Sequence, residues 1–326
     1  MALTYDLVRS FGYSTTVADH CVSGFSATIL ASGSRSGKGA IRMSSGGECR
    51  FGLKTSGNTK YIAFAMKPDF IFNGLGTIMK LKQGGTEHTH MRINSGGQLN
   101  FIKNDNNGLG QTPPIVTAGQ WVHVQMRFLV AFSGGQIEIR VNGSSASVHN
   151  ASGLTFTGNS VDEITLSSGG GMTIDYCDLV VTKDDWPGDF TVGYYKPNGA
   201  GNSTQWTPSA GSNFQTVDEA SKDTSDYNAT STVGNKDTFA LENVTTPSVI
   251  KCVAPIMLAD KQDAGAATIN AVIRHSGTDY DQSAAAPPFG SITYLQPDFL
   301  ETNPGTAAAW VDTDVNAMEL GYKRAS

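Results

Sequence analysis

Two histidines separated by one residue are the first candidates for chemistry in this chain. His88 and His90 would point to the same face of a β-strand. Imidazoles at that spacing can chelate a metal ion, particularly across a threefold axis, and Glu87 and His123 would be the further ligands. This spacing more commonly means that the two histidines simply face solvent, here beside Arg92, and bind no metal. We therefore carry both as candidate ligands and predict no bound metal.

An oxygen-rich loop is the second candidate. Residues 103–108 read Lys-Asn-Asp-Asn-Asn-Gly, and calcium favours carboxylate, amide and carbonyl oxygens. Asp105 is the sole carboxylate of the loop, however, and Asn-Gly is sufficient for a turn. Calcium is therefore the one cofactor for which the sequence contains a candidate loop. We nevertheless predict that no calcium ion is bound there.

Carboxylate spacing bears on sugar cleavage, which needs two carboxylates on opposite sides of the scissile bond. Glu138 stands alone on its expected strand, and adjacent Asp162 and Glu163 must point to opposite faces. Asp175 and Asp178 also face opposite ways if their strand is regular. The sequence contains no GxxxxGK, GxGxxG or GxSxG motif. We predict that the protein is not an enzyme.

The four tryptophans are more often core or interdomain anchors than sugar-stacking platforms. They are Trp121, Trp186, Trp206 and Trp310. Trp121 is expected to begin a strand and to close one end of a hydrophobic core. Trp206 and Trp310 are expected to anchor a second core.

The elements that must position these residues are strands. Val122, Val124, Met126 and Phe128 alternate with polar residues, and the same period of two runs from Gly135 to Val141. Asn142 and Gly143 follow and supply the positive φ values that reverse the chain. The two runs therefore predict a hairpin with one face on a core.

Short strands recur along the chain, and their Gly-rich connections predict an antiparallel sandwich. Turns are expected at 45–47, 83–85 and 95–97, and a helical turn at 313–320. Expected strands are 40–43, 48–53, 60–67, 77–81, 89–93, 98–102, 172–181, 238–241, 248–258, 268–274 and 291–295, with Pro255 marking an edge or bulge.

A shift in composition near residues 186–188 predicts a domain boundary. Of the 326 residues, 1–187 carry 15 basic and 13 acidic side chains, and 188–326 carry 8 and 16. The net charges are therefore +2 and −8, and proline becomes frequent in the second half. We predict an all-β protein of two antiparallel β-sandwich (jelly-roll type) domains in tandem, residues 1–187 and 188–326.

Charge and hydropathy exclude several partners. No basic patch is dense enough for nucleic acid, and no stretch of eighteen apolar residues exists to span a membrane. The first residues lack the basic and apolar regions of a secretory signal, so we expect synthesis and folding in a cytoplasm. The four cysteines are then expected to be free buried thiols. The alternative is a disulfide that forms after release from the cell, between Cys21 and either Cys49 or Cys177.

The Trp-strand, Gly-turn, strand, Asn-Gly pattern at 121–143 resembles the concanavalin-A-like and laminin-G-like lectin sandwiches. Residues 25–43, 61–66 and 162–181 follow the same order. The resemblance implies a sandwich that recognises surfaces or sugars. Residues 188–326 resemble the C-terminal half of structural proteins of tailed bacteriophages and prophages; the similar segments are 188–192, 205–209, 261–265, 309–317 and 319–321.

This second resemblance implies a virion component, such as a head decoration, a collar or neck spike, or part of a tail fibre. Its partners would be other virion proteins, with self-association on a symmetric particle. The acidic half would dock on the virion and the first half would face outward. The alternative is a lectin-type adhesin for host surface glycans, and a polysaccharide hydrolase is disfavoured because the carboxylate pair is missing.

Overall fold

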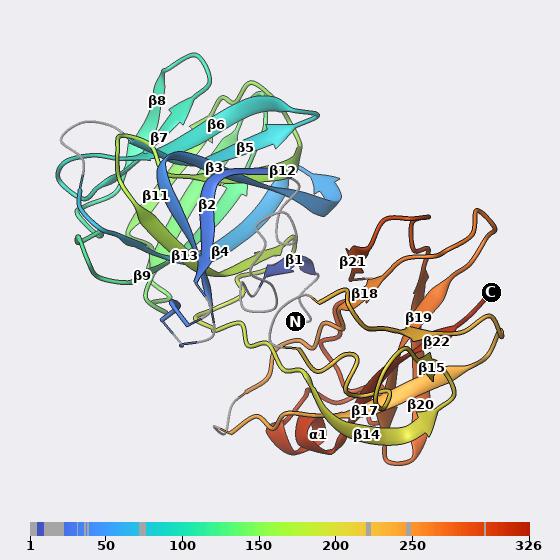
Figure 1. The fold of residues 1–326 in the computed structure, drawn as a ribbon. Helices are drawn as coiled ribbons and strands as arrows, with labels where there is room; N and C mark the ends of the chain where they lie inside the picture. Colours follow the sequence, from blue (N-terminus) through green and yellow to red (C-terminus); the bar gives the residue numbers. More distant parts are fainter. Residues whose placement is uncertain are drawn as a thin grey trace. The chain divides into compact units, whose positions relative to one another are not determined.

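The computed structural model describes residues 5–9, 23–30, 32–35, 37, 39–71, 76–219, 223–245, 249–296 and 298–326, with the side chains of 23–26 outside the description. The chain divides into two compact units, Met1–Tyr194 and Tyr195–Ser326 (Figure 1). Nearly all regular structure in the described ranges is antiparallel β-strand. The predicted all-β class is confirmed.

The first unit is one large antiparallel sheet, whose path runs β11-β10-β9-β4-β13-β3-β12-β5-β6-β7-β8, with β1 paired to β13 and β2 to β3. Its strands are β1 (Tyr5–Arg9), β2 (Ser23–Leu30), β3 (Ala40–Gly57), β4 (Thr59–Pro68), β5 (Gly76–Gln83), β6 (Thr86–Ile93), β7 (Leu99–Lys103), β8 (Gly108–Gln111), β9 (Val122–Leu129), β10 (Gly135–Val141), β11 (His149–Leu154), β12 (Val161–Ser167) and β13 (Ile174–Thr182).

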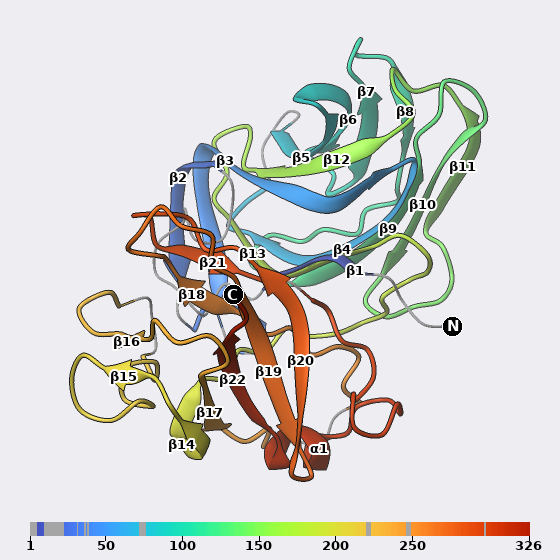
Figure 2. The same ribbon diagram turned by 90° about the vertical axis from the view of Figure 1, so that its right-hand side faces the viewer.

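This sheet folds into two layers that face each other (Figure 2). The first layer holds β11, β10, β9, β4, β13 and β1, and the second holds β12, β5, β6, β7 and β8. Long strand β3 belongs to both, because residues 41–43 pair with β13 and residues 48–57 pair with β12. The turn predicted at 45–47 is therefore wrong: Gly46 has φ +75°, and the strand bends there without reversing.

The core of the first unit lies between the two layers and follows the alternation in the sequence. Val122, Val124, Met126 and Phe128 are all buried in the main cluster, as their period of two predicts. From the second layer, Met91 and Phe101 join the same cluster. The alternate positions of each strand therefore face outward, and these outer faces are where a surface site can form.

The second unit is built on a five-stranded antiparallel sheet of order β14-β17-β22-β19-β20, with two two-stranded ribbons, β15-β16 and β18-β21. The elements are β14 (Pro197–Thr204), β15 (Thr207–Pro208), β16 (Asn228–Ala229), β17 (Lys236–Leu241), β18 (Met257–Ala259), β19 (Ile269–His275), β20 (Thr278–Ala285), β21 (Thr293–Leu295), α1 (Asp312–Ala317) and β22 (Glu319–Arg324).

Two small clusters stabilise this second sheet. One gathers Trp310, Ile273 and Met318 beside α1, and the other gathers Met257 and Ala271 with half-buried Trp206 against them. The long strand predicted at 248–258 is wrong. Of the described residues 249–258, the last two belong to β18, and an isolated bridge at Val253 is the other pairing. Proline at position 255 cannot donate to a ladder, which is consistent with this break.

The described part of the chain contains no helix with the length and apolar character to cross a membrane. Its single helix, α1, has six residues and ends at Ala317, within the segment predicted to hold a helical turn.

Candidate functional site

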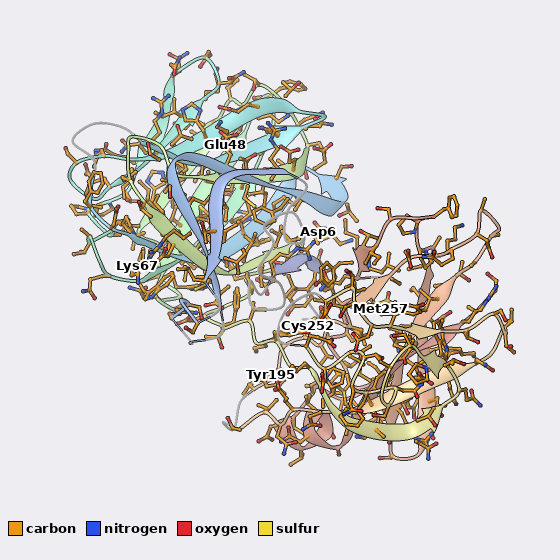
Figure 3. All side chains as sticks on the ribbon, in the orientation of Figure 1. Asp6, Glu48, Lys67, Tyr195, Cys252 and Met257 are labelled. Carbon is orange, nitrogen blue, oxygen red and sulfur yellow. The ribbon has the colours of Figure 1, made fainter. Side chains whose placement is uncertain are left out.

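Four chain segments bring charged side chains and an indole into one row on the outer face of the first layer. Asp175 of β13 pairs in register with Arg42 of β3 on one side and with Lys67 of β4 on the other. Met66 pairs with Val122, which places Lys67 next to Trp121 at the entrance to β9. Because cross-strand partners share a face, these four side chains lie side by side. Lys67 is labelled in Figure 3.

Asp175 is the centre of this row. Its two carboxylate oxygens accept from Nε and Nη2 of Arg42 at 2.7 and 3.0 Å, a bidentate ion pair. The ammonium of Lys67 lies 3.5 Å from the same carboxylate and 5.2 Å from the centroid of the Trp121 ring. The hydrogen bonds that Arg42 donates to Asp175 raise the pKa of Arg42, which keeps the guanidinium charged. Asp175 is buried, while 46% of the Arg42 side chain is exposed.

A hollow of about 280 Å³ opens over this row. Arg42, Lys67 and Asp175 line it together with Pro68, Asp69, Gly119 and Thr173. Three hydrogen bonds tie its rim together, two between backbone groups and one from a backbone N–H to the Asp69 carboxylate. Gly119 N–H donates to the Pro68 carbonyl at 2.7 Å, and Asp69 and Thr173 exchange two bonds at 2.9 and 2.8 Å. The loops of the rim are therefore held in place by the same sheet that positions the charges.

The segment 186–192, here called the strap, lies against the outer face of the first layer beside β9 and β13. Gly188 N–H donates to Gln125 Oε1 at 3.0 Å, and Val192 N–H donates to Asp178 Oδ1 at 2.8 Å. The Phe190 ring contacts His123 edge-on, with the centroids 5.2 Å apart. These contacts place residues 188–192 in the first unit, so the division of the chain comes at 194/195 rather than at the predicted 187/188.

A polar network fastens the strap. Arg35 pairs with Asp178 at 3.0 Å and with Asp189 of the strap at 2.7 Å. His123 lies 3.5 Å from Asp189, and both of its ring nitrogens lack a hydrogen-bond partner. Burial, with a smaller contribution from the charge of Arg35, lowers the pKa of His123 to about 4. The imidazole under the strap is therefore neutral at neutral pH.

Asp178 departs from the regular strand assumed for the carboxylate argument. Its φ is +55°, and the pairing register shifts between Cys177 and Val180. The Cys177 thiol donates to Asp178 at 3.3 Å, so the two neighbouring side chains lie on the same side. The expectation that Asp175 and Asp178 face opposite ways is therefore wrong, because a bulge rotates the backbone there.

His88 and His90 are both buried on β6 rather than solvent-facing. His90 Nδ1 is 2.6 Å from Glu87, His88 Nδ1 is 3.4 Å from the Thr157 hydroxyl, and neither Nε2 has a partner. Burial lowers the pKa of both rings, even against the bond that His90 makes to Glu87. His123 belongs to the other layer, on β9. The structure thus brings Glu87 to His90 but does not bring His123 to either.

The candidate calcium loop is a short turn between β7 and β8. Asp105 is exposed, accepts from Asn107 N–H at 3.0 Å and pairs with Lys103 at 2.9 Å. The bond from Lys103 lowers the pKa of Asp105. Throughout the described ranges, no group of three or more His, Cys, Asp or Glu side chains is arranged to hold a metal ion.

The predicted anchors occupy three different settings. Trp310 is buried in the second unit and donates to the Leu300 carbonyl, and Trp206 packs edge-on against Tyr322 at 4.7 Å. Trp121 is half-buried against Ala40, Ala65 and Cys177, outside the main core cluster.

The predicted Asn-Gly turn is present. Asn142 and Gly143 have φ of +49° and +77°, and the Asn142 side chain accepts from His123 N–H at 3.0 Å. The turn therefore also holds the strand on which His123 lies.

One of the expected free thiols is oxidised. Cys49 is disulfide-bonded, whereas Cys177 and Cys252 are free; Cys21 lies outside the described residues. The expectation of four free thiols is therefore wrong. Strand pairing supplies a physical reason, because Gly24 of β2 is directly opposite Cys49 and β2 begins two residues after Cys21. Cys177 and Cys252 are shielded instead, and burial raises the pKa of both thiols.

Sequence reasoning misses most of the hollow. It marks Asp175 as half of a carboxylate pair and Trp121 as a core residue, but it does not single out Arg42, Lys67 and Asp69. The alternation of each strand does predict that Arg42 and Lys67 point outward. What joins them to Asp175 is the register of β3, β13 and β4, which single-strand patterns do not contain.

Comparison with known proteins gives similarity to solved structures alone. No family model and no curated protein matches the chain. Similar structures include the cellulose-induced protein Cip1 (12% identity, TM-score 0.39, 55% of this chain and 92% of that one). Others are the carbohydrate-binding module CBM66 from Bacillus subtilis (11%, 0.33, 56% and 99%) and the mannose- and Ca²⁺-bound VIP36 exoplasmic/lumenal domain (7%, 0.35, 53% and 86%). Similarities with these TM-scores are too weak to indicate a function for this chain.

Proposed function

We propose that the first unit is a carbohydrate-binding module and that the hollow over Arg42, Lys67 and Asp175 holds a sugar. The observation that carries this proposal is the combination of donors and acceptors in one half-enclosed space. Arg42 and Lys67 offer N–H groups, and Asp69 offers a carboxylate at the rim. Sugar hydroxyls donate and accept at once, so they match a site that presents both kinds of group.

The walls of the hollow also suit the apolar face of a sugar ring. The pyrrolidine of Pro68 and the aliphatic stems of Arg42 and Lys67 supply carbon surface beside the polar groups. Phe70 follows Asp69 directly and is 43% exposed, which puts an aromatic surface next to the rim. Aromatic rings of this kind are frequent in binding surfaces because they add apolar contact.

We propose binding rather than catalysis at this site. The Asp175 carboxylate is occupied by Arg42 and Lys67, and Asp69 Oδ1 accepts from two backbone N–H groups. A general acid must present a carboxyl oxygen to the glycosidic oxygen, whereas both Asp175 oxygens and Asp69 Oδ1 already accept from donors of the protein. Neither group is therefore arranged as the acid of a glycosidase.

The test is binding of the full chain to a glycan array, followed by calorimetry on the best ligands. Arg42→Gln removes the exposed guanidinium and should weaken binding at least tenfold, because a hydrogen bond to a charged group contributes about 1.5–3 kcal/mol. Arg92→Gln changes an arginine of the second layer in the same way and should bind as the wild type does. Absence of any glycan binding by the folded wild-type chain would refute the proposal.

The setting of this module remains a prediction from the sequence resemblance: a structural component of a tailed-phage virion, or a lectin-type adhesin for host surface glycans that the virion carries. The disulfide at Cys49 supports a protein that works outside a reducing cytoplasm, because such bonds persist in oxidising surroundings, virion and cell surfaces included. Labelling of particles with an antibody to this chain, observed by electron microscopy, tests whether the chain belongs to a virion and to which part of it.

A further inference from the structure

The charges that line the hollow cancel. Two are positive, Arg42 and Lys67, and two are negative, Asp69 and Asp175. Asp175 is buried beneath its two cations, whereas Asp69 is exposed at the rim. Asp69 is also close enough to Arg42 to raise the pKa of that guanidinium. A ligand entering the hollow therefore meets the exposed cations and the exposed carboxylate together.

The size of the hollow limits what it can take. At about 280 Å³ it is slightly smaller than the sites of roughly 300–1,000 Å³ that hold drug-sized ligands. That volume suits one sugar ring rather than several. The rim on the side of Pro68, Gly119 and Thr173 is closed by backbone hydrogen bonds, which keeps this volume from widening.

We propose that the hollow selects a single neutral sugar residue and that Asp69 determines this specificity by cancelling the positive charge of the site. The inference rests on the proposed sugar binding and adds the class of sugar. A hexuronate would bring an uncompensated negative charge next to Asp69, and like charges placed together in a binding site are unfavourable. A neutral hexose satisfies both the cations and the carboxylate through its hydroxyl groups.

Asp69→Asn tests this with little change in shape. Asp69 Oδ1 accepts from Phe70 N–H at 2.9 Å and from Thr173 N–H at 2.8 Å, and an asparagine oxygen can accept both. The substitution therefore keeps the rim and changes the net charge of the lining from zero to +1. Asp105→Asn is the matched control, because Asp105 is also exposed and also accepts from a backbone N–H, in a turn of the other layer.

The experiment is calorimetry of the full chain with pairs of methyl glycosides that differ at C6 alone: glucoside and glucuronide, galactoside and galacturonide, mannoside and mannuronide. The wild type should prefer the neutral member of the pair that binds. Asp69→Asn should raise the affinity for the uronide about fivefold, the effect of one unit charge at about 4 Å in water. The gain should shrink as salt is added, and Asp105→Asn should leave the preference unchanged.

The outcomes separate the two proposals. Tighter binding of the uronide by the wild type, or an unchanged preference in folded Asp69→Asn, would overturn the role of Asp69 while leaving sugar binding intact. Binding of neither member of any pair, together with a negative glycan array, would overturn the proposed function itself. Melting curves establish whether Asp69→Asn is folded. If it is not folded, the preference of the wild type between the glycoside and the uronide still tests whether the hollow selects neutral sugars.

Discussion

Truncation within the strap, after Pro187, should destabilise the first unit, although the composition of the chain places a domain boundary there. A chain that ends at Pro187 loses most of the strap, whereas a chain that ends at Tyr194 keeps all of it. The longer chain is therefore expected to melt at a higher temperature. The strap contacts set the size of the difference.

Four contacts described above contribute to this difference. The bond from Val192 N–H to the buried Asp178 carboxylate involves a charged acceptor and is worth about 1.5–3 kcal/mol. The bond from Gly188 N–H to Gln125 is worth about 0.5–1.5 kcal/mol. The ring contact on His123 adds about 0.5–1.5 kcal/mol. The ion pair between Arg35 and the exposed Asp189 adds about 0.5 kcal/mol. Water reaches the freed groups after truncation, so the lower value of each range applies, and the total loss is about 3 kcal/mol.

For a domain of this size, a loss of about 3 kcal/mol lowers the melting temperature by roughly 6–12 °C. Scanning calorimetry would compare chains 1–187 and 1–194 with a third chain of 194 residues in which 188–194 are replaced by glycine and serine. The third chain should have the same melting temperature as chain 1–187, because a glycine-serine segment of the same length does not make the contacts of the strap. Equal melting temperatures for all three chains would refute the reasoning and would place the end of the first domain at residue 187, as the composition predicts. Failure of 1–194 to fold would show that the first unit depends on the second.

Three further predictions concern single side chains. His123 has a folded pKa of about 4, below its unfolded value near 6.5, so the unfolded chain binds more protons between these values. Stability should therefore fall as pH drops from about 6.5 to 4. Urea unfolding of His123→Asn should show a smaller slope, because the lowered pKa values of His88 and His90 still contribute to it. Trp310→Ala removes a buried indole and should cost about 3–5 kcal/mol, measured as a lower unfolding midpoint of the second unit; an unchanged midpoint would contradict its role as an anchor. Alkylation of the denatured, unreduced chain should modify Cys177 and Cys252, with Cys49 added after reduction, as read by mass spectrometry.

The sequence resemblance makes a separate prediction about assembly. If the protein is a virion component, its acidic half should attach to the particle, since residues 188–326 carry a net charge of −8 and repel their own copies at low ionic strength. Particles assembled without those residues should then lose the protein, and particles that lack the first half should keep the remainder. The reverse result would make the first unit the anchor.

Local patterns were sufficient for the class of fold and for most strands. The buried positions of β9 and β10 follow from alternation, because the two faces of a strand are set by neighbouring residues alone. The Asn142–Gly143 turn follows from the ease with which these residue types adopt positive φ. The same reasoning failed at 45–47, where glycines that predict a reversal instead bend a continuous strand. Whether such a chain turns or bends depends on the partners that it finds, here β12 and β13.

Which residues meet in the hollow was determined by the tertiary structure. Arg42 and Asp175 are separated by 133 positions in the chain and are joined by strand register, which long-range pairing sets and local pattern does not. The strap was also determined by tertiary structure. Charge and proline content change at residue 187, but the chain stays in contact with the first layer as far as Val192. Where a strand is regular, the sequence alone determined which side chains point outward. Only the folded chain determined which of those side chains meet, because that depends on residues far apart in sequence.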